Sequence, residues 1–184
     1  MKNRSRQTYD GLRALSALRS KLDSASSLEV IHGNGRLFNA HFTFNPPAQT
    51  EEVDELKRSL HVPLPIAYQQ FLLQYNGAVL YYDDEYGQWG FKLYGTADFL
   101  PTNLSYWKMY EDEWPTSYLV FAESFGDADI LILDTAQFVN EKDCQVIDGD
   151  RGYPLRMWKS AAQSFGDWLD RLVIAQGVKY WRWR

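Results

Sequence analysis

The sequence contains one cysteine, Cys144, among its 184 residues. A single cysteine excludes a disulfide within the chain and a zinc site built from several cysteines. The three histidines, His32, His41 and His61, are too few and too scattered to indicate a zinc site. A chain without crosslinks is typical of a reducing compartment, so we expect a cytoplasmic protein in which Cys144 packs as a small apolar residue.

Long hydrophobic runs are also missing. No stretch approaches the roughly 18 apolar residues of a membrane-spanning helix, and no apolar segment follows the basic residues 1–6 as it would in a secretory signal peptide. The G-x-S-x-G, P-loop and dinucleotide-binding motifs are absent as well. We therefore expect a protein with no membrane segment and without the catalytic and cofactor sites that these motifs mark.

Aromatic and acidic residues are abundant instead. Aromatic side chains make up 16% of the chain, including seven Trp, and such rings serve both in cores and as anchors of protein interfaces. The net charge is −5, but residues 83–143 contain 13 Asp and Glu against 3 Lys, a local charge of −10. That excess opposes nucleic-acid binding and favours a basic protein partner, although acidic loops also serve simply to keep a protein soluble.

The hydrophobic pattern predicts one α+β domain, with a mixed or mainly antiparallel sheet and helices packed on one side. The predicted helices cover residues 8–22, 51–60, 66–75, 102–109 and 160–175. The predicted strands cover residues 28–32, 36–44, 78–82, 88–94, 118–122, 129–134 and 144–148, with a hairpin turn at 33–35. We expect residues 1–45 to form an N-terminal extension of helix and hairpin packed on the main domain, 46–176 to form that domain, and 177–184 to form an aromatic-basic tail.

One ordered set of residues resembles a known family. In chain order the set consists of Leu56, Leu60, Leu64-Pro65, Tyr68, Phe71, Leu72, Asn76-Gly77, Phe121-Ala122, Gly126-Asp127, the segment 129–134, Val146, Ser164-Phe165 and Trp168-Leu169. Each piece alone is common helix or turn punctuation, whereas the ordered set is more specific. It resembles the SUKH superfamily, which includes the yeast Smi/Knr-type cell-wall regulators and many bacterial proteins, and the resemblance spans about residues 51–172.

The resemblance implies an α+β domain without cofactor or catalytic centre. Many bacterial members of the superfamily resemble immunity proteins, which bind a toxin domain, often a nuclease, and block it. The resemblance therefore implies a non-catalytic protein that inhibits a cognate toxin, with a regulatory scaffold of the Smi/Knr type as the alternative. Because a fold does not fix a function, both remain inferences by analogy.

Two acidic-aromatic patches are the candidate partner-binding residues. Their carboxylates suit pairing with basic groups, and their Tyr and Trp rings suit rigid anchoring. The alternative is a pair of solvated loops whose rings fold back onto the core. The candidate residues are Tyr81, Tyr82, Asp83, Asp84, Glu85, Tyr86, Glu111, Asp112, Glu113 and Trp114.

Two further segments leave alternatives open. Asp127 and Asp129, with Glu123 nearby, have the oxygen ligands of a hard cation, but a turn entering a strand explains the same residues through backbone preference. The tail 179–184 alternates basic and aromatic residues. It suits stacking on single-stranded nucleic acid, an edge strand, or docking on the acidic surface of its own domain, and nucleic acid is the least favoured of the three.

Overall fold

A computed structural model describes residues 11–32, 35–140 and 142–183. Within them the strands form one sheet of eight, in which every strand pairs antiparallel with its neighbour in sequence. The strands are β1 Ser27–Ile31, β2 Leu37–Phe44, β3 Ala78–Tyr82, β4 Phe91–Leu93, β5 Tyr118–Ser124, β6 Ile130–Asn140, β7 Asp143–Gly149 and β8 Lys159–Ala162. The expected α+β class with a mainly antiparallel sheet is confirmed.

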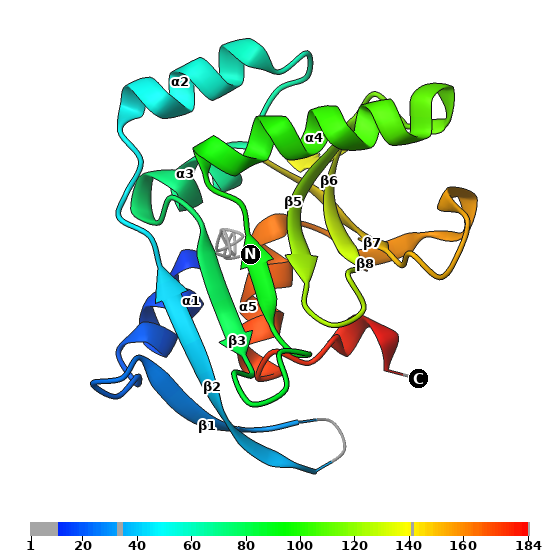
Figure 1. Cartoon of the computed structure of the whole chain (residues 1–184). Coiled ribbons are helices and arrows are strands. Elements are labelled where there is room, and N and C mark those ends of the chain that lie inside the picture. Colours follow the sequence, from blue (N-terminus) through cyan, green and yellow to red (C-terminus); the bar gives the residue numbers. More distant parts are fainter. Residues whose placement is uncertain (1–10, 33–34, 141, 184) are drawn as a thin grey trace, which may run out of the picture.

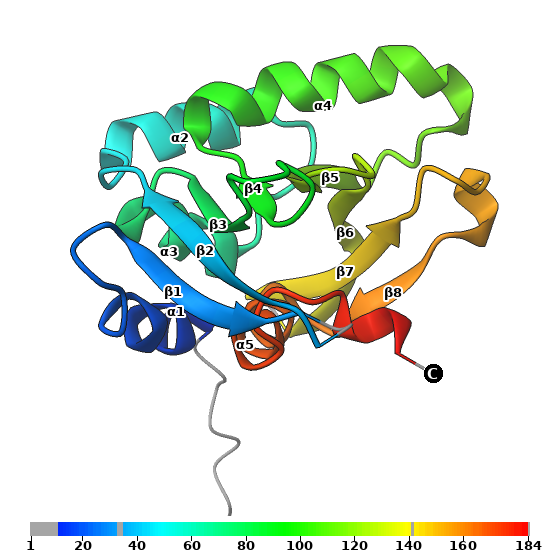
Figure 2. The same cartoon turned by 60° about the horizontal axis from the view of Figure 1, so that its bottom comes forward.

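Five α-helices accompany the sheet in the described residues. They are α1 Gly11–Arg19, α2 Thr50–Ser59, α3 Ile66–Gln74, α4 Thr96–Tyr110 and α5 Phe165–Ile174, and single 3₁₀ turns occur at η1 Glu111–Glu113, η2 Leu155–Met157 and η3 Tyr180–Arg182. Figures 1 and 2 show α1 and α5 together against one face of the curved sheet, whereas α2 and α4 run across one end of it. Accordingly α5 contacts β7 and β8, while α4 contacts β5.

The centre of the core lies where α3 meets α5 and the sheet. On α3, Tyr68, Phe71 and Leu72 are fully buried, and the Tyr68 ring packs edge-on against Phe165 at 5.1 Å. The Tyr68 hydroxyl donates to the carbonyl of Tyr94 at 2.6 Å, which satisfies a polar group inside the core. These three residues of the family resemblance are therefore part of the core.

The Asn76-Gly77 pair follows the end of α3 and also positions α4. Gly77 has φ of +92°, and a Cβ there would approach the Gly95 nitrogen to 2.8 Å, so glycine is required for two reasons. The Asn76 side chain accepts a hydrogen bond from the Thr96 N–H at 2.7 Å and donates one to the Thr96 hydroxyl at 3.0 Å. The end of one helix is thereby tied to the start of the next.

Helix α4 is longer than the predicted segment 102–109. It begins at Thr96 and contains Pro101, which removes one helical hydrogen bond. Tertiary contacts offset that loss: Phe99 and Asn103 are fully buried, and the Asn103 amide both donates to and accepts from the backbone of Val120 in β5, at 2.9 and 2.8 Å. Tertiary packing therefore stabilises a helix over residues where the local sequence, with Pro101, does not predict one.

The predicted helix 160–175 is wrong at its start, because residues 159–162 form β8. Helix α5 begins five residues later than predicted, at Phe165, after Ser164, whose hydroxyl accepts the Asp167 N–H at 3.1 Å. Asp143, on β7, also accepts the N–H groups of Phe165 and Gly166, each at 3.0 Å. These hydrogen bonds fix the start of α5 on a buried carboxyl group. Burial raises the pKa of Asp143, although the hydrogen bonds act to lower it.

The N-terminal segment joins the main domain at two places. Strand β2 pairs with β3, so β1 and β2 extend the common sheet, and α1 packs against α5. The predicted helix 8–22 appears as Gly11–Arg19, while its residues 8–10 and the turn residues 33–34 lie outside the described residues. Among the described helices, none combines the length and apolar character needed to cross a bilayer.

Candidate protein-binding site

Tyr81, in the first acidic-aromatic patch, is a core residue. In the pairing of β2 with β3, Leu80 and Tyr81 together stand opposite Phe42, which is a β-bulge. Consecutive residues of a regular strand face opposite sides, but this bulge lets both Leu80 and Tyr81 point inward. The Tyr81 ring lies 4.8 Å from that of Phe42, its hydroxyl donates to the Val173 carbonyl at 3.3 Å, and burial raises the pKa of Tyr81.

Asp83 is also buried and organises the turn that follows β3. Its carboxylate accepts hydrogen bonds from the N–H groups of Glu85 at 3.1 Å and Tyr86 at 3.4 Å. Only 1% of the residue is exposed. Asp83 therefore acts on the backbone of its own turn, as aspartate commonly does in tight turns.

The exposed carboxylates of the first patch are paired within the molecule. Asp84 lies 3.2 Å from His41, and Glu85 lies 3.1 Å from Arg36, so both contacts reach β2 or the residue just before it. The Arg36 guanidinium also lies over the Tyr86 ring, 4.3 Å from its centre. A hydrogen bond to Glu85 raises the pKa of Tyr86. Tyr82 is half-buried against Phe125, with ring centres 5.0 Å apart.

The second patch differs. Glu111, Asp112 and Glu113 form the exposed turn η1 at the end of α4, and none of their carboxylates pairs with a cation of the described residues. Trp114 is buried beneath them, 5.3 Å from the Tyr110 ring and 6.1 Å from the Trp158 ring. We call Glu111–Glu113 the acidic turn.

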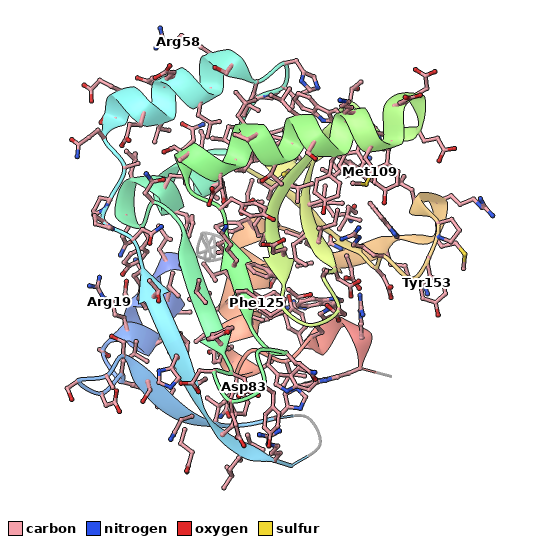
Figure 3. All side chains as sticks on the ribbon, in the orientation of Figure 1. Arg19, Arg58, Asp83, Met109, Phe125 and Tyr153 are labelled. Atoms are coloured by element: carbon pink, nitrogen blue, oxygen red, sulfur yellow. The ribbon has the colours of Figure 1, made fainter. Side chains whose placement is uncertain are left out.

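The structure keeps the two patches apart. Figure 3 places Asp83 at the lower end of the molecule and Met109, beside the acidic turn, at the far end of α4. As core residues, Tyr81, Asp83 and Trp114 present no exposed side chain to a partner, which corrects the expectation for these three. The assignment of the other seven candidates stays a prediction.

The C-terminal tail docks on the domain, which was one of the three alternatives. Lys179 contacts Asp127 at 2.6 Å and Asp129 at 2.7 Å. Arg182 makes two contacts to Asp148, at 2.7 and 2.8 Å, and further contacts to Asp129 at 2.8 Å and to a fourth aspartate, at position 150, at 3.4 Å. We call these four carboxylates the aspartate cluster.

The aspartate cluster holds the tail by charge, and aromatic packing reinforces it. The Trp181 ring lies 6.2 Å from Phe91 and 6.3 Å from Trp168. Burial would raise the pKa of Asp127, but hydrogen bonds from Lys179 and Ser124 outweigh it and lower that pKa. Within the described residues, no group of three or more His, Cys, Asp or Glu is arranged to hold a metal ion.

Sequence reasoning missed one surface, the loop 150–158 between β7 and β8. This loop and the tail line a groove of about 480 Å³. Its aromatic content was visible in the sequence, since Tyr153 and Trp158 flank Pro154 and Met157. The sequence did not reveal that the tail lies beside this loop. The tail is held there by the contacts of Lys179 and Arg182 with the aspartate cluster.

The model of the SMI1 / KNR4 family (SUKH-1) matches residues 47–171. The uncharacterized protein YobM of Bacillus subtilis (strain 168) is 24% identical over 184 residues, covering 94% of this chain and 91% of YobM. The uncharacterized protein YnaB of the same organism is 24% identical over 151 residues, covering 78% of this chain and 88% of YnaB. Residues 1–46 and 172–184 lie outside the family match.

Proposed function

The chain belongs to the SMI1 / KNR4 family (SUKH-1), and from that premise we propose that it is a non-catalytic binding protein of the cytoplasm that inhibits a cognate toxin. The partner we propose is a protein domain with a basic surface, such as a nuclease, which carries Lys and Arg to hold its own nucleic acid. Binding across that surface would keep the nucleic acid away without any chemistry on the inhibitor.

The acidic turn is the observation that supports this proposal. Its three carboxylates are exposed and have no ion pair among the described residues. Met109, 58% exposed, adjoins them and adds an apolar contact. Unpaired carboxylates on a fixed turn raise the rate at which a basic partner arrives, because they attract it before contact.

The test measures binding kinetics with the protein encoded by the neighbouring gene. The variant is Glu111→Gln with Asp112→Asn and Glu113→Gln, and the matched control is Glu29→Gln with Glu51→Gln and Glu55→Gln, which removes the same charge from exposed residues elsewhere. We expect the first variant to slow association by about tenfold at low salt, and the control to slow it much less. Unchanged association in the first variant would remove the acidic turn from the proposal.

The same experiment separates inhibition from a regulatory role. A toxin activity of the neighbouring protein that disappears when this protein is added supports the immunity function. The relatives YobM and YnaB are described only as uncharacterized, so they favour neither role. A neighbouring gene that encodes no toxin, together with binding to a cell-wall or signalling protein, would replace the immunity function with the regulatory one.

A further inference from the structure

The loop 150–158, the start of β8 and the tail line a groove on the described surface that the core does not use. Its volume of about 480 Å³ falls within the range of about 300–1,000 Å³ that is usual for binding clefts. The lining residues are Asp148, Asp150, Tyr153, Met157, Trp158, Lys159, Ser160, Trp181, Arg182 and Trp183.

Exposed apolar side chains gather at this groove. Tyr153 is 56% exposed, Met157 51% and Trp183 65%, and all three line it. Tyr, Trp, Met and Arg are the residue types enriched at the centres of protein interfaces, and most of the lining belongs to these types. Figure 3 places the labelled Tyr153 and Met109 toward the same side of the view.

Both walls of the groove are held in place before any partner arrives. On the loop side, the Trp158 indole N–H donates to the carbonyls of Asp150 at 2.9 Å and Tyr153 at 3.2 Å. On the tail side, Arg182 is anchored in the aspartate cluster, and Asp148 and Asp129 raise its pKa although burial opposes this. A groove that is already ordered loses little conformational entropy on binding, which favours affinity.

The charges that line the groove balance one another. Asp148 and Asp150 carry two negative charges, Lys159 and Arg182 carry two positive ones, and Arg182 already contacts both aspartates. A neutral, aromatic groove offers no net charge to attract an ion. The complementary occupant is therefore an uncharged apolar side chain, recognised by contact with the rings.

We propose that this groove receives an apolar anchor, an aromatic or aliphatic side chain, from the protein partner. The proposal rests on the proposed function and assigns it a second contact site. It divides the work between two places: the acidic turn speeds association, and the groove slows dissociation.

The two places are linked by ring packing through Trp158. The Trp158 ring, in the loop, lies 6.2 Å from the Tyr110 ring, at the end of α4, and 6.1 Å from Trp114, at the acidic turn. Figure 1 shows the loop between the end of α4 and the C-terminus. A single partner can thus contact the acidic turn and the groove at once.

The first arm of the test needs no natural partner. The ¹⁵N-labelled protein has seven Trp, whose indole N–H signals are assigned by single Trp→Phe changes and then followed during titration with N-acetyltryptophan amide. We expect the signals of Trp158, Trp181 and Trp183 to shift, with an affinity that changes less than about twofold between about 0.05 and about 0.5 M salt. N-acetyllysine amide should leave them unmoved.

Variants locate the binding. Tyr153→Ala with Met157→Ala changes only exposed side chains of the groove, and the matched control is Leu73→Ala with Leu104→Ala, two exposed apolar residues elsewhere. The first pair should abolish the shifts and the control should preserve them. Shifts spread equally over all indole signals, or shifts that survive in the groove variant, would overturn the proposal.

The second arm uses the neighbouring gene product. The groove variant should dissociate from it at least about tenfold faster with little change in association, because anchors act mainly on dissociation. An unchanged dissociation rate would overturn the groove as an anchor while leaving inhibition through the acidic turn intact. If the gene product does not bind the unaltered protein, the proposed function fails, and the titration still decides whether the groove accepts an apolar side chain.

Discussion

The turn after β3 and the acidic turn after α4 have nearly the same composition, three consecutive acidic residues beside large rings, yet the fold treats them differently. In the first, Asp83 is buried and Asp84 and Glu85 pair with His41 and Arg36. In the second, all three carboxylates remain exposed, and only the ring beneath them is buried. Groups from elsewhere in the chain thus decide how many carboxylates of an acidic-aromatic segment remain unpaired.

The largest expected difference lies within the first patch. Tyr81→Ala should lower the free energy of unfolding by about 3–5 kcal/mol, because it empties a core position. Tyr86→Ala, five residues along, should change it by less than about 1 kcal/mol, because that ring is exposed and loses only its contact with Arg36. Urea denaturation measures both. Equal effects of the two changes would contradict the division of this patch into core and surface.

The aspartate cluster predicts the next largest effect. Asp129→Asn removes the carboxylate that contacts both Lys179 and Arg182 and is only 4% exposed itself. We expect a loss of about 2–3 kcal/mol, less than for a fully buried pair because Arg182 keeps its contacts to Asp148. The tail should also become cleavable by trypsin after Lys179, which mass spectrometry detects. Asp98→Asn, which breaks a half-exposed pair with Lys92, is the control and should leave the tail protected.

A matched pair of neutralisations sharpens the comparison of the two turns. Asp84→Asn with Glu85→Gln should cost up to about 1 kcal/mol, since it breaks the surface ion pair with Arg36 and the contact with His41, which is an ion pair only when the imidazole is protonated. Glu111→Gln with Glu113→Gln removes the same charge, breaks no ion pair of the described residues, and should change stability by less than about 0.5 kcal/mol. Thermal unfolding at low salt compares them, and added salt should shrink the difference. A larger loss from the second pair would mean that the acidic turn has a partner within the chain.

Acid should weaken the contacts that hold the tail, and we expect this change in stability to be the smallest of those predicted here. Because the folded protein lowers the pKa of Asp127, this group stabilises the fold above its unfolded pKa of about 3.9 and loses that contribution as pH falls through the folded value. Asp143, whose pKa is raised, acts in the opposite direction. Tryptophan fluorescence below about pH 4 should therefore change less in Asp127→Asn than in the unaltered protein. Identical acid transitions would show that Asp127 does not contribute to holding the tail.

The sequence allowed prediction of the fold more readily than of the site. Periodicity located α2 and α3 within a residue or two, and Asn76-Gly77 marked the end of α3. Prediction from periodicity failed where contacts between distant residues determine the secondary structure. Asn103 forms hydrogen bonds with β5, which stabilises α4 despite Pro101, and residues 159–162 form a strand because they pair with β7. Local preference is weak compared with such contacts.

The candidate residues show the same limit at finer scale. No local signal distinguishes buried Tyr81 from exposed Tyr86, because a bulge in the pairing with β2 turns Tyr81 inward. Nor could the sequence reveal that Arg36 and His41 would lie beside the first patch. Exposure of a charged loop depends on which other segments fold next to it, and that is a property of the tertiary structure.

The neighbour-to-neighbour order of the sheet has a consequence for how the chain folds. Because each strand pairs with the next one in sequence, the sheet can form one strand at a time, and each step closes only a short loop of chain. The connections from β2 to β3 and from β4 to β5 are longer, because they contain α-helices. The packing of α1 on α5 is different, since it joins the two described α-helices that lie farthest apart in sequence. During synthesis α1 emerges well before α5, so we expect the packing of α1 on α5 to be a late step, with the apolar side of α1 open to chaperones until then.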